Sequence, residues 1–207
     1  MDGLGVPSPV LMERASLCVA HEVWSLLAGQ DLPVWVLVGP GNNGGDGLAV
    51  ARILSGWGAR VRAVLTTSKR NAAAEQQLAL ARSVGVDVHE SLPEAPAQAL
   101  VVDGMLGTGS TGAPRGGIAD ALRWQAGILG PKVAIDVPSG VDVDVGTVHP
   151  GAFEADLTVT FVRSKPGLHV TPGRDAAGVV VVADIGIVPD PTSTPRTRLI
   201  APEHVGQ

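Results

Sequence analysis

The 207-residue sequence contains only one cysteine and no tyrosine. A single cysteine, Cys18, excludes an internal disulfide framework and favours a reducing compartment, which we expect to be the cytoplasm. Because Cys18 stands among apolar residues, we expect it to fill space in the core rather than act as a nucleophile.

Excess basic charge and long apolar runs are also missing. The net charge is −5 and the isoelectric point is about 5.4, and no basic stripe occurs, which argues against a nucleic acid as partner. No apolar run approaches the roughly 20 residues of a membrane-spanning helix, so no membrane partner is expected. The N-terminus lacks the basic and apolar regions of a signal peptide. The length suits one domain with a substantial core.

The most informative stretch begins with the apolar residues 34–38, which are typical of a buried strand. Residues 39–47 follow with five glycines and with Asn42, Asn43 and Asp46 between them. Residues 48–54 then have the pattern of a helix, and Asp46 is predicted to be its N-cap. A strand, a glycine-rich loop and a helix N-terminus in this order predict an anion-binding site, because free backbone N–H groups and the helix dipole favour phosphate.

This glycine pattern is not that of an ordinary dinucleotide-dependent dehydrogenase. Gly39, Gly41 and Gly44 satisfy G-x-G-x-x-G, but the next predicted strand, 61–65, lacks the terminal acid that would hold the ribose hydroxyls. An NADP-dependent oxidoreductase that uses Lys69 or Arg70 for a 2′-phosphate is the weakest of three hypotheses. No Gly-Lys-Ser/Thr follows the loop, which excludes a Walker A motif.

Strands and helices alternate along the rest of the chain. Ser8 and Pro9 are predicted to be the N-cap and first position of a helix ending at Gly29, with His21 on its surface. Further helices are predicted after the cap Asn71 to residue 84 and over 117–129, and further strands over 61–65, 86–88, 99–103, 132–136, 155–161 and 178–182. This order predicts a Rossmann-like, doubly wound, mostly parallel sheet with helices on both faces, a three-layer α/β/α fold.

Three of the predicted strands end in polar loops that contain glycine. The first loop has Asn42, Asn43 and Asp46, the second has Asp103 followed by residues 107–109, and the third has Asp136 followed by Ser139. Because ligands bind beyond the carboxyl ends of parallel strands, we expect these loops to converge on one cleft.

Several ordered motifs resemble the YjeF N-terminal domain family, the NAD(P)HX epimerases. The resemblance covers residues 1–188 and rests on segments 11–15, 39–47, 103–109, 136–140, 160–167, 172–173 and 181–186. The proline-containing residues 189–207 are expected to be a tail or linker. In many bacterial relatives an ATP- or ADP-dependent NAD(P)H-hydrate dehydratase domain follows, whose Gly-Thr-Gly-Asp motif this chain does not have; such a dehydratase is a candidate fused or separate partner.

The resemblance implies an enzyme of nicotinamide nucleotide repair, often a homodimer, that interconverts the R and S epimers of hydrated NADH and NADPH. It implies one potassium ion per subunit, held by Asn43, Asp103 and Ser139, and oxygen ligands suit such a hard cation. The substrate contacts that it implies are Asn42, Asn43, Gly44, Gly45, Asp46, Gly107, Thr108, Gly109, Ser110, Thr111, Gly112, Ala113 and Asp136.

The chemistry follows from the substrate that the resemblance supplies. Its hydroxyl lies on a ring carbon next to nitrogen, so acid-assisted loss of water and re-addition of water to the other face inverts that carbon without a redox partner. We expect Asp136 to be the catalytic acid/base, with Lys165 as a second polar candidate. The alternative is a non-catalytic module that binds a nucleotide or a partner in the same cleft. Ser16 replaces a usual glycine of the family, and without tyrosine the wall against the substrate ring is not identified.

Overall fold

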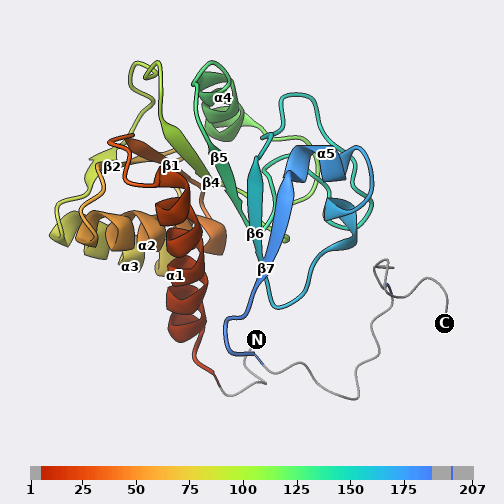
Figure 1. Cartoon of the computed structure of the whole chain (residues 1–207), viewed down its shortest axis with the longest axis horizontal. Coiled ribbons are helices and arrows are strands. Elements are labelled where there is room, and N and C mark those ends of the chain that lie inside the picture. The colour runs from red at the N-terminus through yellow and green to blue at the C-terminus, as the bar shows by residue number, and fades with distance from the viewer. Residues whose placement is uncertain (1–5, 188–196, 198–207) are drawn as a thin grey trace.

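The computed structural model describes residues 6–187 and Thr197, and these form one seven-stranded, entirely parallel sheet with helices on both faces (Figure 1). The predicted tail or linker, residues 189–207, lies outside the described part of the chain except for Thr197. The elements in chain order are α1 (Ser8–Leu27), β1 (Val34–Val38), α2 (Asn42–Gly56), β2 (Val61–Leu65), α3 (Ala72–Ser83), β3 (Asp87–His89), β4 (Leu100–Gly104), α4 (Gly116–Gln125), β5 (Lys132–Ile135), β6 (Leu157–Phe161), the 3₁₀ turn η1 (Pro166–Leu168), α5 (Gly173–Ala177) and β7 (Val179–Ala183).

The strand order is β3-β2-β1-β4-β5-β6-β7, and every pair is parallel. The chain winds outward from β1 in one direction and then returns to start again at β4, so the order reverses between these two strands. In doubly wound sheets this reversal opens the crevice in which ligands bind. All residues of β1 and β4 are buried, which agrees with the continuous apolar run of β1 and with the apolar residues 100–102 that precede Asp103 in β4.

The two faces of the sheet are covered unequally. Helices α1, α2 and α3 pack side by side on one face, whereas α4 lies apart from them on the other (Figure 1). The larger core lies under the first three helices and includes Val36, Leu48 and Leu54. The smaller core lies under α4 and includes Trp35, Leu37 and the fully buried Phe153. The predicted three-layer fold is therefore confirmed.

Most predicted elements are confirmed within a few residues, and Asn71 caps α3 by accepting a hydrogen bond from the N–H of Ala74 at 2.9 Å. Among the helices, α1 is capped by Pro7 rather than Ser8 and ends at Leu27 rather than Gly29, and α4 ends at Gln125, four residues before the predicted end at residue 129. Cys18 packs partly buried against the larger core, and His21 is exposed, as expected. In the described part of the chain, no helix combines the length and apolar character needed to cross a membrane.

The main correction concerns the start of α2. Gly41 is its N-cap and the helix begins at Asn42, so Asp46 lies inside the helix and does not cap it. Four of the glycines that suggested a loop serve close packing instead. A Cβ at Gly39 would lie 1.8 Å from the carbonyl oxygen of Met105, and one at Gly44 would lie 2.0 Å from that of Gly39. Gly45 lies against Met12, and Gly47 lies against Val36.

We expect Gly44→Ala to destabilise the fold by about 3 kcal/mol, because the new methyl group cannot fit without moving α2 away from the backbone at Gly39. The matched control is Gly56→Ala in the same helix, where nothing lies within 4 Å of the added Cβ. That change should be neutral or stabilise the protein by up to about 1 kcal/mol. Urea unfolding of both variants measures the difference, and equal effects would contradict the close approach.

Candidate active site

A pocket of about 630 Å³ opens at the carboxyl ends of the central strands. The first turn of α2, the loop after β4, the end of β5 and the segment after β6 all contribute to it, so the predicted loops do converge on one cleft. Of the residues proposed from the sequence, those that line it are Asn42, Asn43, Asp46, Gly107, Thr108, Gly109, Ser110, Asp136 and Lys165. The volume is within the range of small-molecule sites in proteins.

The N-terminus of α2 presents unpaired donors at this pocket. No hydrogen-bond acceptor for the N–H groups of Asn42, Asn43 and Gly44 occurs among the described residues, and the N-cap Gly41 has no side chain to supply one. The positive end of the helix dipole adds to these donors. The anion-binding geometry predicted from the sequence is therefore present, although the helix starts earlier than expected.

The three residues proposed as cation ligands lie together at the base of the cleft. Asp103 and Ser139 are fully buried, and the Ser139 hydroxyl donates to Asp103 Oδ1 at 2.8 Å. The N–H groups of Ser139 and Met105 also donate to this carboxylate, at 2.7 and 3.0 Å. Leu106 connects Asn43 to Asp103 and Ser139. Its N–H donates to Ser139 Oγ at 3.0 Å, and its carbonyl accepts from Asn43 Nδ2 at 2.8 Å.

Asp103 has no basic partner in the described part of the chain. Burial raises the pKa of Asp103 to about 6, and the hydrogen bonds from Ser139 and Met105 limit this rise because they stabilise the ionised form. The site thus contains a desolvated carboxylate whose negative charge is compensated only by neutral donors.

Asp136 is held by contacts from two directions. It directly follows β5 and has the left-handed φ of 68°, with the Val137 N–H donating to the Ile135 carbonyl across it at 2.8 Å in a three-residue turn. Lys165 Nζ forms an ion pair with Asp136 Oδ1 at 2.6 Å, and the Thr160 hydroxyl donates to the same oxygen at 3.1 Å. Lys165, the second polar candidate from the sequence, is therefore a direct partner of Asp136.

Asp46 also faces the pocket but has a different environment. Among residues 6–187, no group forms a hydrogen bond with its carboxyl, and only its backbone carbonyl accepts from a side chain, that of Ser16 at 3.2 Å. Burial raises the pKa of Asp46 well above its usual range, and the nearby negative charge of Asp136 raises it further.

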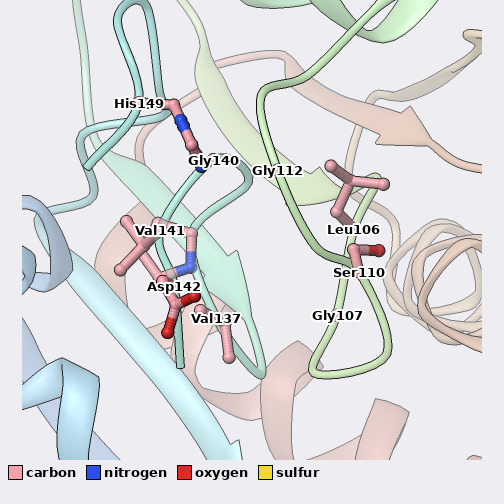
Figure 2. A pocket seen from close by; sticks show the side chains of 10 residues that line it. Leu106, Gly107, Ser110, Gly112, Val137, Gly140, Val141, Asp142 and His149 are labelled. Carbon is pink, nitrogen blue, oxygen red and sulfur yellow. The ribbon is translucent and has the colours of Figure 1, made fainter. Parts of the chain in front are cut away.

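Other residues proposed from the sequence lie outside this pocket. Gly44 and Gly45 are buried behind its wall, packed against Gly39 and Met12. Gly112 lines a separate, small cavity of about 10 Å³, which Figure 2 shows between the loop of Leu106 and Ser110 and the segment of Val137 to Asp142. Thr111 and Ala113 line neither pocket.

Sequence reasoning missed the apolar wall of the large pocket. This wall comes from the start of α1 and from segments after β6 and β7, and it comprises Leu11, Met12, Ala15, Phe161, Val162, Ile185 and Ile187. Phe161 brings an aromatic ring to a site that has no tyrosine. Leu11 and Ala15 lie in the helix predicted from the sequence, but that prediction did not indicate that a ligand pocket is their neighbour.

The structure gives no support to the oxidoreductase hypothesis. Lys69 and Arg70 do not line the pocket, and Arg70 is engaged by Glu75 at 3.0 Å and by the carbonyl of Thr67 at 2.9 Å.

The parallel order with its reversal at β1 and β4, and the anion-binding helix start beside a carboxyl-bearing cleft, define a Rossmann-like protein with a site suited to a nucleotide. Residues 8–167 match the family described as YjeF-related protein N-terminus, and the chain belongs to this family.

Relatives with assigned names agree with this placement. An NAD(P)H-hydrate epimerase of Limosilactobacillus reuteri is 39% identical over 183 residues, with 87% of this chain and 86% of the relative covered. A bifunctional NAD(P)H-hydrate repair enzyme of Hyperthermus butylicus is 40% identical over 199 residues, but this chain covers only 36% of it. The crystal structure of the yeast protein YNL200c superposes with a TM-score of 0.67 at 26% identity, over 84% of this chain and 77% of that one.

The environment of Asp103 predicts a pH-dependent stability. Because the pKa of Asp103 is raised from 3.8 to about 6 in the folded protein, ionisation opposes folding, and its contribution to the free energy of unfolding falls as the pH rises through this interval. The full difference corresponds to about 3 kcal/mol.

We therefore expect Asp103→Asn to flatten the decline in unfolding free energy between about pH 4 and about pH 7, as measured by urea unfolding in potassium-free buffer. The comparison uses the slope, because the amide also loses one hydrogen bond with Ser139 at every pH. Parallel profiles for the two proteins would show that Asp103 titrates normally.

Proposed function

We propose that this protein is an NAD(P)H-hydrate epimerase, which interconverts the R and S forms of hydrated NADH and NADPH. The observation that carries this proposal is the Asp136–Lys165 ion pair, which lies in the same pocket as the anion-binding start of α2. This chain covers 86% of the length of relatives that are named NAD(P)H-hydrate epimerase, and the substrate in the proposal is taken from that name.

The pocket offers separate regions for the two ends of such a substrate. The N–H groups of Asn42 and Asn43, which have no acceptor among the described residues, suit the pyrophosphate because they lie at the positive end of the helix beside the pocket. The carboxyl groups of Asp46 and Asp136 suit the hydrated ring, where a proton must be moved. Phe161 and the apolar residues of α1 suit the ring faces and exclude water.

The reaction needs proton transfer at one carbon and no oxidant. The hydroxyl leaves as water once it is protonated, and the ring nitrogen stabilises the cation that remains. Water then adds to the opposite face and loses a proton. We assign Asp136 as a catalytic residue in this exchange, with one oxygen fixed by Lys165 and Thr160 and the other free to face the ring.

We further propose that each subunit binds one potassium ion through Asn43, Asp103 and Ser139. In support, these residues offer oxygen donors only, and Asp103 is a buried carboxylate without a basic partner in the described part of the chain. Asn43 Nδ2 is engaged by Leu106, which leaves Asn43 Oδ1 available. The ion would offset the desolvated charge of Asp103 and stiffen the loops beneath the substrate.

The exposed face of α1 and the amino-acid composition bear on assembly and compartment. A homodimer is supported by the exposed apolar side chains Val10, Leu17 and Trp24, which recur every seven residues along one face of α1. A reducing, cytoplasmic setting is supported by the single cysteine. A dehydratase, fused or separate, is supported by the bifunctional relatives, of which this chain spans 36 to 39%.

We expect the purified protein to accelerate equilibration of separated R- and S-NADPHX, followed by chromatography. Asp136→Asn should lower the rate about 100-fold or more and retain substrate binding, because asparagine tolerates the left-handed φ at this position. The matched control is Asp120→Asn on the exposed surface of α4, which should keep the wild-type rate. A folded protein that binds NADPHX without turnover would instead favour the non-catalytic binding module.

Potassium is expected to raise the melting temperature more than sodium does at equal ionic strength, because only the folded protein presents the ligand set. Asp103→Asn should abolish the difference between the two salts, and Asp120→Asn should preserve it. Differential scanning fluorimetry measures this effect without any need for activity. Equal melting temperatures in both salts would remove potassium from the proposal and leave the epimerase untouched.

A further inference from the structure

Inversion of the hydroxyl-bearing carbon involves proton transfer on both faces of the ring. The hydroxyl departs from one face of the ring and the new water arrives at the other. A donor is therefore needed where the hydroxyl leaves, and an acceptor is needed where the water adds. The resemblance and the sequence pattern supplied one such group, Asp136, whereas the pocket contains a second carboxyl.

The two carboxyl groups come from different elements. Asp136 follows β5, while Asp46 projects from the second turn of α2. Gly47 brings α2 close to β5, because the position of its absent Cβ lies 3.9 Å from Ile135 Cδ1, the side chain next to Asp136 in sequence. Lys165 is the third ionisable group that lines the pocket.

Their hydrogen bonding divides the two carboxyl groups into different chemical states. Asp136 Oδ1 accepts hydrogen bonds from the Lys165 ammonium at 2.6 Å and from the Thr160 hydroxyl at 3.1 Å, so this carboxyl already serves as an acceptor in the pocket. The Asp46 carboxyl receives no hydrogen bond from residues 6–187 and has no cation beside it. A desolvated carboxyl in that position retains its proton more readily than one that is paired.

We propose that Asp46 is a second catalytic residue and serves as the proton donor, with Asp136 as the proton acceptor and Lys165 as the residue that keeps Asp136 in this role. This inference rests on the proposed epimerase function and deepens it. It is supported by the raised pKa of Asp46, which burial and the charge of Asp136 both cause.

The atoms and charges balance over one turnover. Asp46 gives its proton to the ring hydroxyl, the carbon–oxygen bond breaks with its electron pair on oxygen, and one water leaves. A second water forms a new carbon–oxygen bond on the other face and gives a proton to Asp136. The proton then returns from Asp136 to Asp46 through water in the open pocket, which restores the enzyme. The opposite epimer follows the same steps in reverse, starting from the enzyme form in which water has moved the proton from Asp46 to Asp136.

The test compares a carboxyl-to-amide change at Asp46 in the pocket with the same change at Asp120 on the exposed surface. Asp46→Asn should reduce kcat for R/S equilibration by about 100-fold or more while KM changes little, since the amide is isosteric with the neutral acid but donates no mobile proton. Asp46→Glu should recover part of the rate, and Asp120→Asn should keep it. The melting temperature of Asp46→Asn should equal or exceed that of the wild type, because no hydrogen bond to this carboxyl is lost.

Chemical rescue separates proton donation from a structural role. Added formic acid should raise the rate of Asp46→Ala in a saturable manner and leave the wild-type rate unchanged, because a small acid fits the space left by the removed side chain. An active wild type with Asp46→Asn within a few-fold of its kcat would overturn the assignment. A rise in KM of Asp46→Asn at constant kcat would also overturn it. If Asp46→Asn does not fold, the assignment is overturned when formic acid does not rescue Asp46→Ala and Asp46→Glu is inactive. A folded but inactive wild type would refute the epimerase function itself.

Discussion

The close approach of α2 to the strand ends beneath it is the constraint on which the site depends. Gly39 touches the backbone at Met105, and Gly44 touches the backbone at Gly39, so the loops after β1 and β4 and the first turn of α2 form one tightly packed unit. This contact fixes where the helix points its unpaired N–H groups, and it places Asn43 over the loop of Leu106. Any side chain at Gly39 or Gly44 would separate these parts and widen the cleft at its base.

The three carboxyl groups of the site differ in their depth and in their hydrogen-bond partners. Asp103 is the deepest and is surrounded by neutral donors from Ser139 and Met105. Asp136 lies at the pocket surface beside the Lys165 ammonium group, and Asp46 lies there without a cationic partner among residues 6–187. Three carboxyl groups in one small region thus have three different environments, and the proposed roles of cation ligand, proton acceptor and proton donor follow this division.

The fold and the position of the site were predictable, because both depend on patterns that are local in sequence. The apolar residues of β1 and β4 predicted buried parallel strands. Asp103 lies one residue before the end of β4 and Asp136 directly follows the neighbouring β5, so the topology brings them together. The start of α2 was not predictable, because Gly44 and Gly45 have the composition of a loop and are explained only by distant backbone and by Met12. The pairing of Lys165 with Asp136 likewise joins residues 29 apart in sequence through tertiary structure.

The turns at the ends of β5 and β6 repeat one another. After β6, Val162 has a φ of 66°, and the Arg163 N–H donates a hydrogen bond to the Phe161 carbonyl at 2.7 Å. After β5, the Val137 N–H donates to the Ile135 carbonyl across Asp136 in the same way. The backbone that leads to the ion pair is thus set by two neighbouring strands in fixed register. The exposed outer part of the connection between them, around Asp144 and Val145, does not position the pair. Insertions and deletions there are therefore expected to accumulate among descendants of this chain, while the contact between the Asp136 carboxyl and the Lys165 ammonium is kept although their separation in sequence changes.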